Sequence, residues 1–135
     1  MTLVALAAGF VLSSSALANG HPMPVRFTCS GSNISPPLQW TAPPSGTKSF
    51  SLRMVDLDTH PQFRHWSLTK IPAGTRRLAS GTTVGRAARN TFGEAGYGGP
   101  CPPPGQTHRY LFVLDALGPG GKHLAAARLL VTYRR

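Results

Sequence analysis

Acidic residues are scarce in this chain of 135 residues, which carries four Asp and Glu against 14 Lys and Arg and a formal net charge of +10. Only 13% of the residues are charged, about half of the usual quarter. Such a chain attracts anions, for example phosphate ligands, acidic membranes or nucleic acid. The basic residues are spread from Arg26 to Arg135 and form no basic tail. This spread favours a solvated cationic surface and argues against a specific nucleic-acid site.

Several other features are missing. No apolar run reaches the roughly 18 residues that cross a bilayer. The GxSxG motif of serine hydrolases, a P-loop and a dinucleotide-binding fingerprint are also absent from the sequence. There are two cysteines and neither lies in a CxxC motif, which argues against a zinc ribbon or a thioredoxin-like site. Cys29 and Cys101 therefore form one disulfide or remain two thiols.

Glycine and proline are plentiful, at 15 and 13 residues, which argues against a helical bundle and favours short strands joined by turns. Apolar and polar residues alternate in the segments that we interpret as strands. The Gly- and Pro-rich segment 93–105 is expected to be a loop, and segment 32–44 a connection. Short strands at loop-rich intervals predict an antiparallel sandwich or barrel. The predicted strands are Phe50–Val55, His65–Ile71, Arg109–Leu117 and Leu124–Tyr133, the last alternatively a short helix followed by a strand.

The N-terminus has two interpretations. Residues 3–12 are apolar, and Ala16–Ala18 resembles the small-residue cleavage site of a secretory signal peptide. No Lys or Arg precedes the apolar stretch, however, and Phe10–Ser14 also fits a first strand.

Polar residues continue the core-facing side of two predicted strands. Residues two apart on a strand share a face, so the face defined by Phe50, Leu52 and Met54 extends to Asp56 and then Asp58. If the strand stays regular, the Cα atoms of the two aspartates lie about 6.6 Å apart on one side.

The third strand repeats this pattern, because Phe112 and Leu114 share a face with Tyr110 and His108. Burying a carboxylate without a partner is costly, so donors from His or Tyr should lie beside the aspartates. The two strands together predict a small polar pocket at one end of the sheet.

Less specific interpretations remain open. The Asp-x-Asp sequence often caps its own turn, and His108 fits an ordinary half-buried histidine. A metal-dependent enzyme or a hydrolase built from Asp56, Asp58, His65 and His108 is the alternative function, since these are suitable ligand and acid–base types. No fixed motif spacing supports it.

Five segments in this order resemble the phosphatidylethanolamine-binding protein family, in particular its bacterial Raf-kinase-inhibitor-like, YbhB/YbcL-type branch. Each segment is weakly specific alone, and their order makes the resemblance specific from about residue 12 to residue 135. The segments are Cys29–Trp40 (CSGSNISPPLQW), Asp56–Asp58 (DLD), His65–Trp66, Tyr97–Gly105 (YGGPCPPPG) and His108–Tyr110 (HRY).

The resemblance implies an all-β fold, an antiparallel β-sandwich with a small anion-binding pocket near one end, and a non-enzymatic binding function. Its motifs place the ligand-binding residues at Asp56, Asp58, His65, Gly99, Pro100, His108 and Tyr110. Four of these are the residues of the alternation argument. The implied ligand is a small anion or a phospholipid headgroup, and neither a metal nor a cofactor is implied.

In such a pocket, His65, His108 and Tyr110 would donate hydrogen bonds, together with backbone N–H groups near Gly99. Asp56 would orient a histidine or meet an ammonium group. An unperturbed histidine has a pKa of about 6.5. Anion affinity should therefore rise as the pH falls through that region and the histidines become positively charged.

The sequence departs from the family pattern in ways that carry expectations. Segment 118–122 is short, so the family's peripheral helix is expected to be shortened or missing, which favours a homodimer. The family's opening segment matches Ser13–Pro24, which argues against cleavage after Ala18; a signal over residues 1 to about 9 is the alternative. We therefore interpret residues 1–11 as an apolar signal remnant or strand lead-in and 12–135 as one domain.

The resemblance also bears on partners and location. The branch's name suggests that it inhibits a kinase, although no kinase-binding surface is evident in the residues, and no specific nucleic-acid partner is expected. Family members occur on both sides of the membrane. Because cleavage after Ala18 is not favoured, a cytoplasmic location is slightly favoured over a periplasmic or secreted one.

Overall fold

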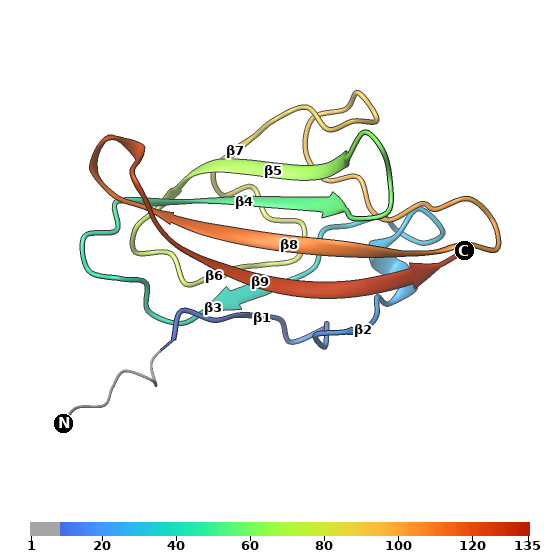
Figure 1. Cartoon of the computed structure of the whole chain (residues 1–135), viewed down its shortest axis with the longest axis horizontal. Coiled ribbons are helices and arrows are strands. Elements are labelled where there is room, and N and C mark those ends of the chain that lie inside the picture. The colour runs from blue at the N-terminus through green and yellow to red at the C-terminus, as the bar shows by residue number, and fades with distance from the viewer. Residues whose placement is uncertain (1–8) are drawn as a thin grey trace.

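The computed structural model describes residues 9–135, which form a β-sandwich of two sheets (Figure 1). A six-stranded sheet has the order β2-β9-β8-β4-β5-β7, and a three-stranded sheet has the order β1-β3-β6. The strands are β1 (Leu12–Ser13), β2 (His21–Pro22), β3 (Leu38–Trp40), β4 (Ser49–Asp56), β5 (Phe63–Pro72), β6 (Arg77–Leu78), β7 (Arg86–Ala87), β8 (Thr107–Leu117) and β9 (His123–Arg134).

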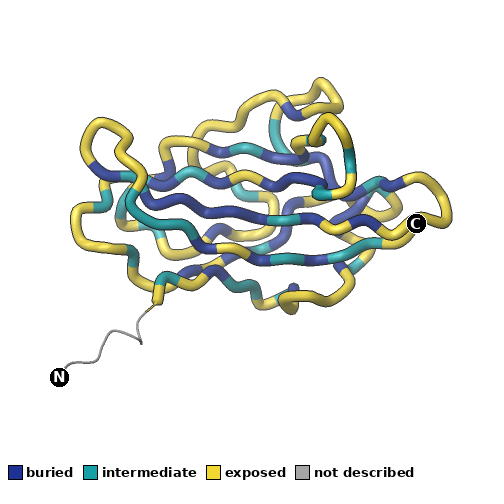
Figure 2. Tube along the Cα trace, in the orientation of Figure 1, coloured by how far each residue is buried: buried dark blue, intermediate teal, exposed yellow. Residues whose placement is uncertain are grey.

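The long strands confirm the alternation pattern of the sequence. β4 lies between β5 and β8, and its Phe50, Leu52 and Met54 are at most 2% exposed. Buried positions alternate with more exposed ones from Ser49 to Met54, whereas β8 is buried without a break from Phe112 to Ala116 (Figure 2). The predicted all-β sandwich is therefore confirmed, and one pairing departs from antiparallel: β2 runs parallel to β9 at the sheet edge.

The loop between β8 and β9 is a short 3-10 turn, η3 (Pro119–Gly121), with Gly120 and Gly121 at positive φ. The part of the chain from residue 9 onward contains no α-helix, so the expected loss of the peripheral helix is confirmed. β9 is a strand along its whole length, which excludes the helix-then-strand alternative for Leu124–Tyr133. A second 3-10 helix, η2, spans Val25–Phe27.

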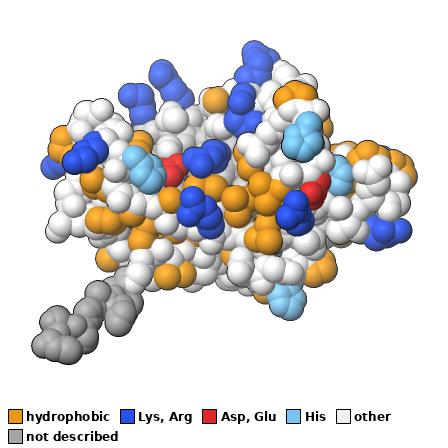
Figure 3. Space-filling model, in the orientation of Figure 1, with side chains coloured by type: hydrophobic (Ala, Val, Ile, Leu, Met, Phe, Trp, Pro, Cys, Tyr) orange, Lys and Arg blue, Asp and Glu red, His pale blue; other side chains and the backbone are white. Residues whose placement is uncertain are grey.

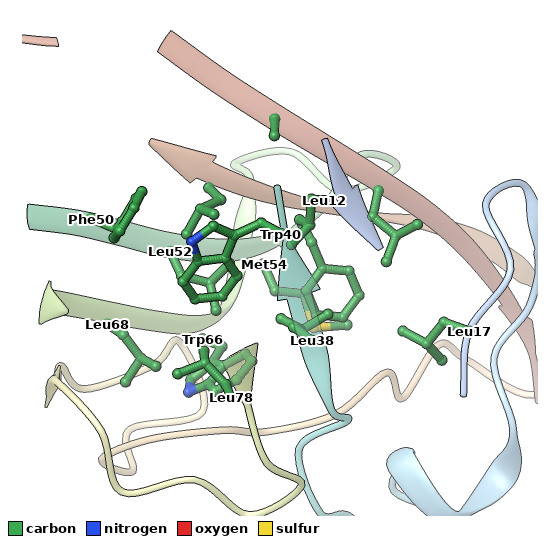
Figure 4. Packing of buried hydrophobic residues seen from close by; sticks show 14 of the residues in the cluster. Leu12, Leu17, Leu38, Trp40, Phe50, Leu52, Met54, Trp66, Leu68 and Leu78 are labelled. Atoms are coloured by element: carbon green, nitrogen blue, oxygen red, sulfur yellow. The ribbon is translucent and has the colours of Figure 1, made fainter. Parts of the chain in front are cut away.

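The core lies between the two sheets. Trp40 of β3 packs edge-on against Phe50 of β4, with ring centroids 5.3 Å apart, and Leu38 and Leu78 face the same cluster (Figure 4). Segment 32–44, expected to be a connection, thus contributes a strand and two core residues. Each fully buried side chain of this size contributes about 1.5–3 kcal/mol of transfer free energy.

The N-terminal segment joins this core within the described residues. Leu12 and Leu17 are 3% and 7% exposed, and β1 pairs with β3. Cleavage after Ala18 would remove both leucines from the core. The alternative signal over residues 1 to about 9 lies almost entirely outside the described residues.

The surface carries its cations in a dispersed arrangement. Figure 3 shows Lys and Arg side chains spread over the face in view, with apolar side chains between them. Among residues 9–135, no helix has the length and apolar character to span a bilayer.

Candidate functional site

A small cavity lies where β4 ends and its antiparallel neighbour β8 begins. Its volume is about 90 Å³, far below the roughly 300–1,000 Å³ of sites for drug-sized ligands. It therefore has room for a small ion or headgroup. The lining residues are Asp56, Thr59, Phe63, His65, Phe92, Cys101, Pro102, Pro103, His108 and Tyr110.

The pairing of β4 with β8 brings three of the predicted site residues together. Asp56 lies directly opposite Tyr110 in the register, and His108 precedes Tyr110 on the same face of β8. All three are buried, with at most 8% exposure. The sequence alternation correctly predicted this arrangement.

Asp56 and His108 form a buried pair. His108 Nδ1 lies 2.6 Å from Asp56 Oδ2, which fits an Nδ1–H that donates to the carboxylate. On the other side of the ring, Nε2 lies 3.0 Å from Gln106 Oε1. A protonated ring would donate to this oxygen. In a neutral ring Nε2 accepts, and the Gln106 side-chain amide would be rotated so that its NH₂ group donates to it. The protein itself therefore engages both nitrogens of His108.

His65 enters the cavity through a bulge in β5. Met54 pairs with Trp66 and Val55 with Arg64, so His65 is the extra residue that the partner strand does not match. Its Nδ1–H donates to Gly98 O at 2.7 Å, and within the described residues its Nε2 makes no hydrogen bond. In the neutral ring, Nε2 is thus an acceptor available to a ligand.

Aromatic rings surround His65 on several sides. The ring centroids of Phe63, Tyr110 and Phe92 lie 4.7, 5.3 and 5.5 Å from that of His65. Burial among these residues lowers the pKa of His65, and the Gly98 carbonyl and the Asp56 charge oppose this shift only in part. His65 is therefore neutral at neutral pH in the free protein.

Tyr110 is fully buried, and its hydroxyl has no hydrogen-bond partner among residues 9–135. Burial raises its pKa above the ordinary value, and the nearby Asp56 charge adds to the shift. The hydroxyl consequently stays protonated and keeps an unused donor. Buried polar groups without a partner are rare in proteins and call for an explanation.

Asp58 does not face the cavity, contrary to the sequence expectation. β4 ends at Asp56, and the Asp58 backbone N–H donates to Asp56 Oδ1 at 2.7 Å. This turn directs Asp58 outward, where its carboxylate accepts from the Arg109 backbone N–H at 2.8 Å and from its guanidinium at 2.7 Å. These bonds hold the pKa of Asp58 at about 2. Asp56 thus caps the turn that follows β4, as the less specific interpretation of the Asp-x-Asp sequence predicted.

Gly99 and Pro100 also lie outside the lining of the cavity. The Gly99 N–H donates to Asn33 Oδ1 at 2.8 Å, so this donor faces the neighbouring turn. A Cβ on Gly99 would lie 2.2 Å from Phe27 O, so the close packing of the backbone at this position leaves no space for a side chain. The segment supports the cavity indirectly, because the adjacent Gly98 carbonyl orients His65.

The two cysteines form a disulfide with a Cα–Cα distance of 5.4 Å. It joins the turn after η2 to the Pro-rich loop, and Cys101 itself lines the cavity together with Pro102 and Pro103.

Sequence reasoning missed several lining residues. Phe63 lies two residues before His65, so strand alternation would have placed it on the same face. Phe92 and Thr59 lie on loops, where no periodic pattern applies. The described residues hold no cluster of three or more His, Cys, Asp or Glu with the geometry of a metal site, so the metal-dependent alternative gains no support.

Comparison with known proteins identifies the family. The family model described as phosphatidylethanolamine-binding protein matches residues 13–132. The chain belongs to the phosphatidylethanolamine-binding protein family. Its relatives place it in the YbhB/YbcL-type branch, and proteins of this family are generally binding proteins.

Two curated relatives illustrate the similarity. A UPF0098 protein of Aquifex aeolicus is 39% identical, with 90% of this chain and 86% of the relative covered. A Mycobacterium tuberculosis protein provisionally named lipoprotein LppC is 37% identical, with 88% of this chain and 64% of the relative covered. The chain thus spans less than two thirds of LppC.

A solved structure confirms the fold. The crystal structure of Escherichia coli YbcL, described as a member of the mammalian PEBP family, superposes with a TM-score of 0.86 at 30% identity and covers 95% of this chain and 99% of YbcL.

Proposed function

We propose that this protein binds a small oxyanion, either free phosphate or the phosphate of a phospholipid headgroup, in the cavity between β4, β5 and β8. Binding occurs without chemical change to the ligand. The observation that carries the proposal is the Tyr110 hydroxyl, a fully buried donor that lines the cavity without an acceptor. A ligand oxygen would supply that acceptor.

The charge of the cavity makes this binding depend on protons. No Lys or Arg lines it, and Asp56 contributes a buried carboxylate. An oxyanion beside Asp56 therefore needs an added proton nearby, either on His65 Nε2 or on a ligand hydroxyl that donates to it. In both cases Tyr110 donates to a second ligand oxygen.

Asp56 acts in this proposal as an orienter and leaves little room for an ammonium group. Its Oδ2 accepts from His108 at 2.6 Å, and its Oδ1 accepts from the Asp58 backbone N–H at 2.7 Å. Both oxygens are thus already engaged, and the pair fixes the ring of His108.

The Asp56–His108 pair also has the geometry of a general-base dyad, which is the observation in favour of a hydrolase. A nucleophile is harder to assign. Cys101 is in a disulfide, and Thr59 Oγ1 already accepts from the Phe63 N–H at 2.8 Å. The dyad therefore supports binding better than covalent catalysis.

The test is an NMR titration with inorganic phosphate and with O-phosphoethanolamine, comparing wild type with Tyr110→Phe. The variant keeps the ring and removes the donor, so affinity for both ligands should fall by about 10- to 100-fold, the effect of one hydrogen bond to a charged group. Removing an unsatisfied buried hydroxyl should leave stability unchanged or slightly increased.

Tyr97→Phe is the matched control. Its hydroxyl donates to Phe27 O at 2.6 Å, outside the cavity, so this variant should lose about 0.5–1.5 kcal/mol of stability and keep wild-type phosphate affinity. Equal phosphate affinity in wild type and Tyr110→Phe would refute the proposal. Turnover of O-phosphoethanolamine would favour the hydrolase instead.

A further inference from the structure

A second hollow lies at the β5–β7 edge of the six-stranded sheet. Its volume is about 260 Å³, and Trp66 and Leu68 of β5 and Ala87 of β7 form part of its wall, with segments 33–35, 81–85 and 96–97 completing it. We call it the edge groove. It shares no lining residue with the oxyanion cavity.

The lining of the edge groove carries no charge, although the chain has 14 Lys and Arg. Two aliphatic residues of the lining, Ile34 and Val84, are 39% and 37% exposed. Threonine and serine hydroxyls lie among the apolar residues. A charged ligand would lose hydration in this groove without gaining a partner, so the lining selects a neutral, mainly apolar molecule.

Trp66 supplies one specific polar group to the groove. The residue is only 2% exposed, and its indole N–H makes no hydrogen bond within residues 9–135. Figure 4 shows the indole nitrogen at the edge of the core cluster. Trp66 Nε1 is not among the fully buried unpaired atoms of the described residues, so this donor stays open to solvent on a residue that lines the edge groove. The neighbouring Tyr97, whose ring packs edge-on at 5.3 Å, already uses its hydroxyl on Phe27 O.

Trp40 provides a useful contrast. Its indole N–H is fully buried without a partner among the described residues, and Trp40 lines neither the oxyanion cavity nor the edge groove. An unpaired N–H in the closed core has no route to a ligand, whereas the N–H of Trp66 adjoins one.

The walls of the edge groove are held in place by the protein alone. The Gly81 N–H donates to Ser35 Oγ at 3.0 Å, and Ser80 Oγ donates to Ser35 O at 2.6 Å. On the other side, the Gly96 N–H donates to Ala88 O at 3.0 Å. A preformed site avoids the cost of ordering loops when a ligand binds.

We propose that the edge groove binds a small, neutral, largely apolar ligand whose hydrogen-bond acceptor pairs with the Trp66 indole N–H. This site is separate from the oxyanion cavity and does not depend on its function.

The test follows the indole N–H signals by NMR during titration with ethyl benzoate, a neutral aromatic ester with a carbonyl acceptor. The spectrum of Trp40→Phe assigns the remaining signal to Trp66. Ethyl benzoate should move the Trp66 signal downfield and saturate. Ethylbenzene, which lacks an acceptor, should cause no downfield shift, and benzoate, which is charged, should bind more weakly by about tenfold.

Two substitutions localise the effect. Val84→Arg places a charge at the edge groove and should weaken ethyl benzoate binding by about tenfold. Val25→Arg makes the same change at a residue that is 53% exposed and lines neither hollow, so its binding should match wild type. Both variants should keep wild-type phosphate affinity, which separates this site from the oxyanion cavity. A Trp66 signal that never saturates, or equal weakening by both variants, would overturn the proposal.

Discussion

At the scale of single residues, Asp56, His65, His108 and Tyr110 differ in how much of their hydrogen-bonding capacity the protein uses. Asp56 and His108 have both ends engaged, so their geometry is fixed before any ligand arrives. His65 keeps Nε2, and Tyr110 keeps its hydroxyl. One acceptor and one donor thus remain for a ligand, which matches an oxyanion that carries a proton.

The exposed ion pair of Asp58 with Arg109 should affect stability without affecting binding in the cavity. The pKa of Asp58 is about 2, below the ordinary value of 3.8, because Arg109 binds the charged form. The unfolded state therefore binds more protons between these two values, and the stabilisation present above about pH 4 is lost as the pH falls toward about 2. In urea unfolding across this window, wild type should lose stability more steeply than Asp58→Asn.

Asp58→Asn should also bind phosphate like wild type, because Asp58 lies outside the cavity lining. Parallel stability curves for the two proteins would contradict the assigned role of the Arg109 pair, and a large loss of phosphate affinity would return Asp58 to the site.

At the scale of elements, regular strands were the part that the sequence could predict. β4 alternates from Ser49 to Met54 and β8 from Thr107 to Phe112, and this regular part of each strand brings Asp56, His108 and Tyr110 together as the pattern predicted. Alternation failed at Asp58, because β4 ends at Asp56, two residues before it, and the chain turns there. The alanines of segment 124–127 allow a helix by propensity, but pairing with β8 along almost the whole of β9 overrides that preference.

Contacts that depend on two or more segments of the chain could not be predicted from the pattern of one segment. The bulge that turns His65 inward depends on the match between β5 and β4, which a single strand's pattern does not contain. Phe92 reaches the cavity from a loop through tertiary packing. The role of Gly99 likewise became clear only from its contact with the turn at Phe27.

Gly99→Ala tests that contact between elements. A Cβ there would lie 2.2 Å from Phe27 O and 3.0 Å from Thr28 Cα, so the segment must shift, at a cost of about 1–3 kcal/mol of stability. Because the segment carries the Gly98 carbonyl that orients His65, phosphate affinity should fall as well.

Gly74→Ala is the control, since a Cβ at Gly74 meets nothing within 4 Å. It should change stability by less than about 0.5 kcal/mol. Chemical denaturation of both variants measures the difference, and equal stabilities would show that close packing does not explain Gly99.

At the scale of the whole molecule, the disulfide ties distant parts of the chain together. Cys29 and Cys101 are 72 residues apart in sequence, so the cross-link restricts a long loop in the unfolded state. Disulfides persist mainly in oxidising compartments. The cross-link is thus more typical of a periplasmic or secreted protein, the second of the two locations that the sequence left open.

The Cys29→Ser/Cys101→Ser variant should be less stable than wild type by about 2–4 kcal/mol. Urea unfolding with and without reductant measures this loss, which reductant should reproduce in wild type but not in the variant. Phosphate affinity should fall too, because Cys101 forms part of the cavity wall. Unchanged stability after reduction would contradict this account of the cross-link.

The net charge of +10 acts at the same scale, raising the local concentration of anions around the molecule. Specificity must come from the cavity itself, which no Lys or Arg lines. Surface attraction and cavity binding therefore differ in their response to pH, since arginine stays charged at all ordinary pH values.

Proton-coupled oxyanion binding is tested most directly by the pH dependence of sulfate affinity, measured by NMR at about pH 5.5, 6.5 and 7.5, the range in which histidine changes charge. Sulfate keeps its own charge over this range, so any change comes from the protein. Burial lowers the pKa of His65 in the free protein, and bound sulfate should raise it again. The account predicts that affinity increases as pH falls, by up to about tenfold per pH unit, with the His65 ring signals titrating at higher pH in the complex. A sulfate affinity independent of pH, or an unchanged His65 titration, would contradict it.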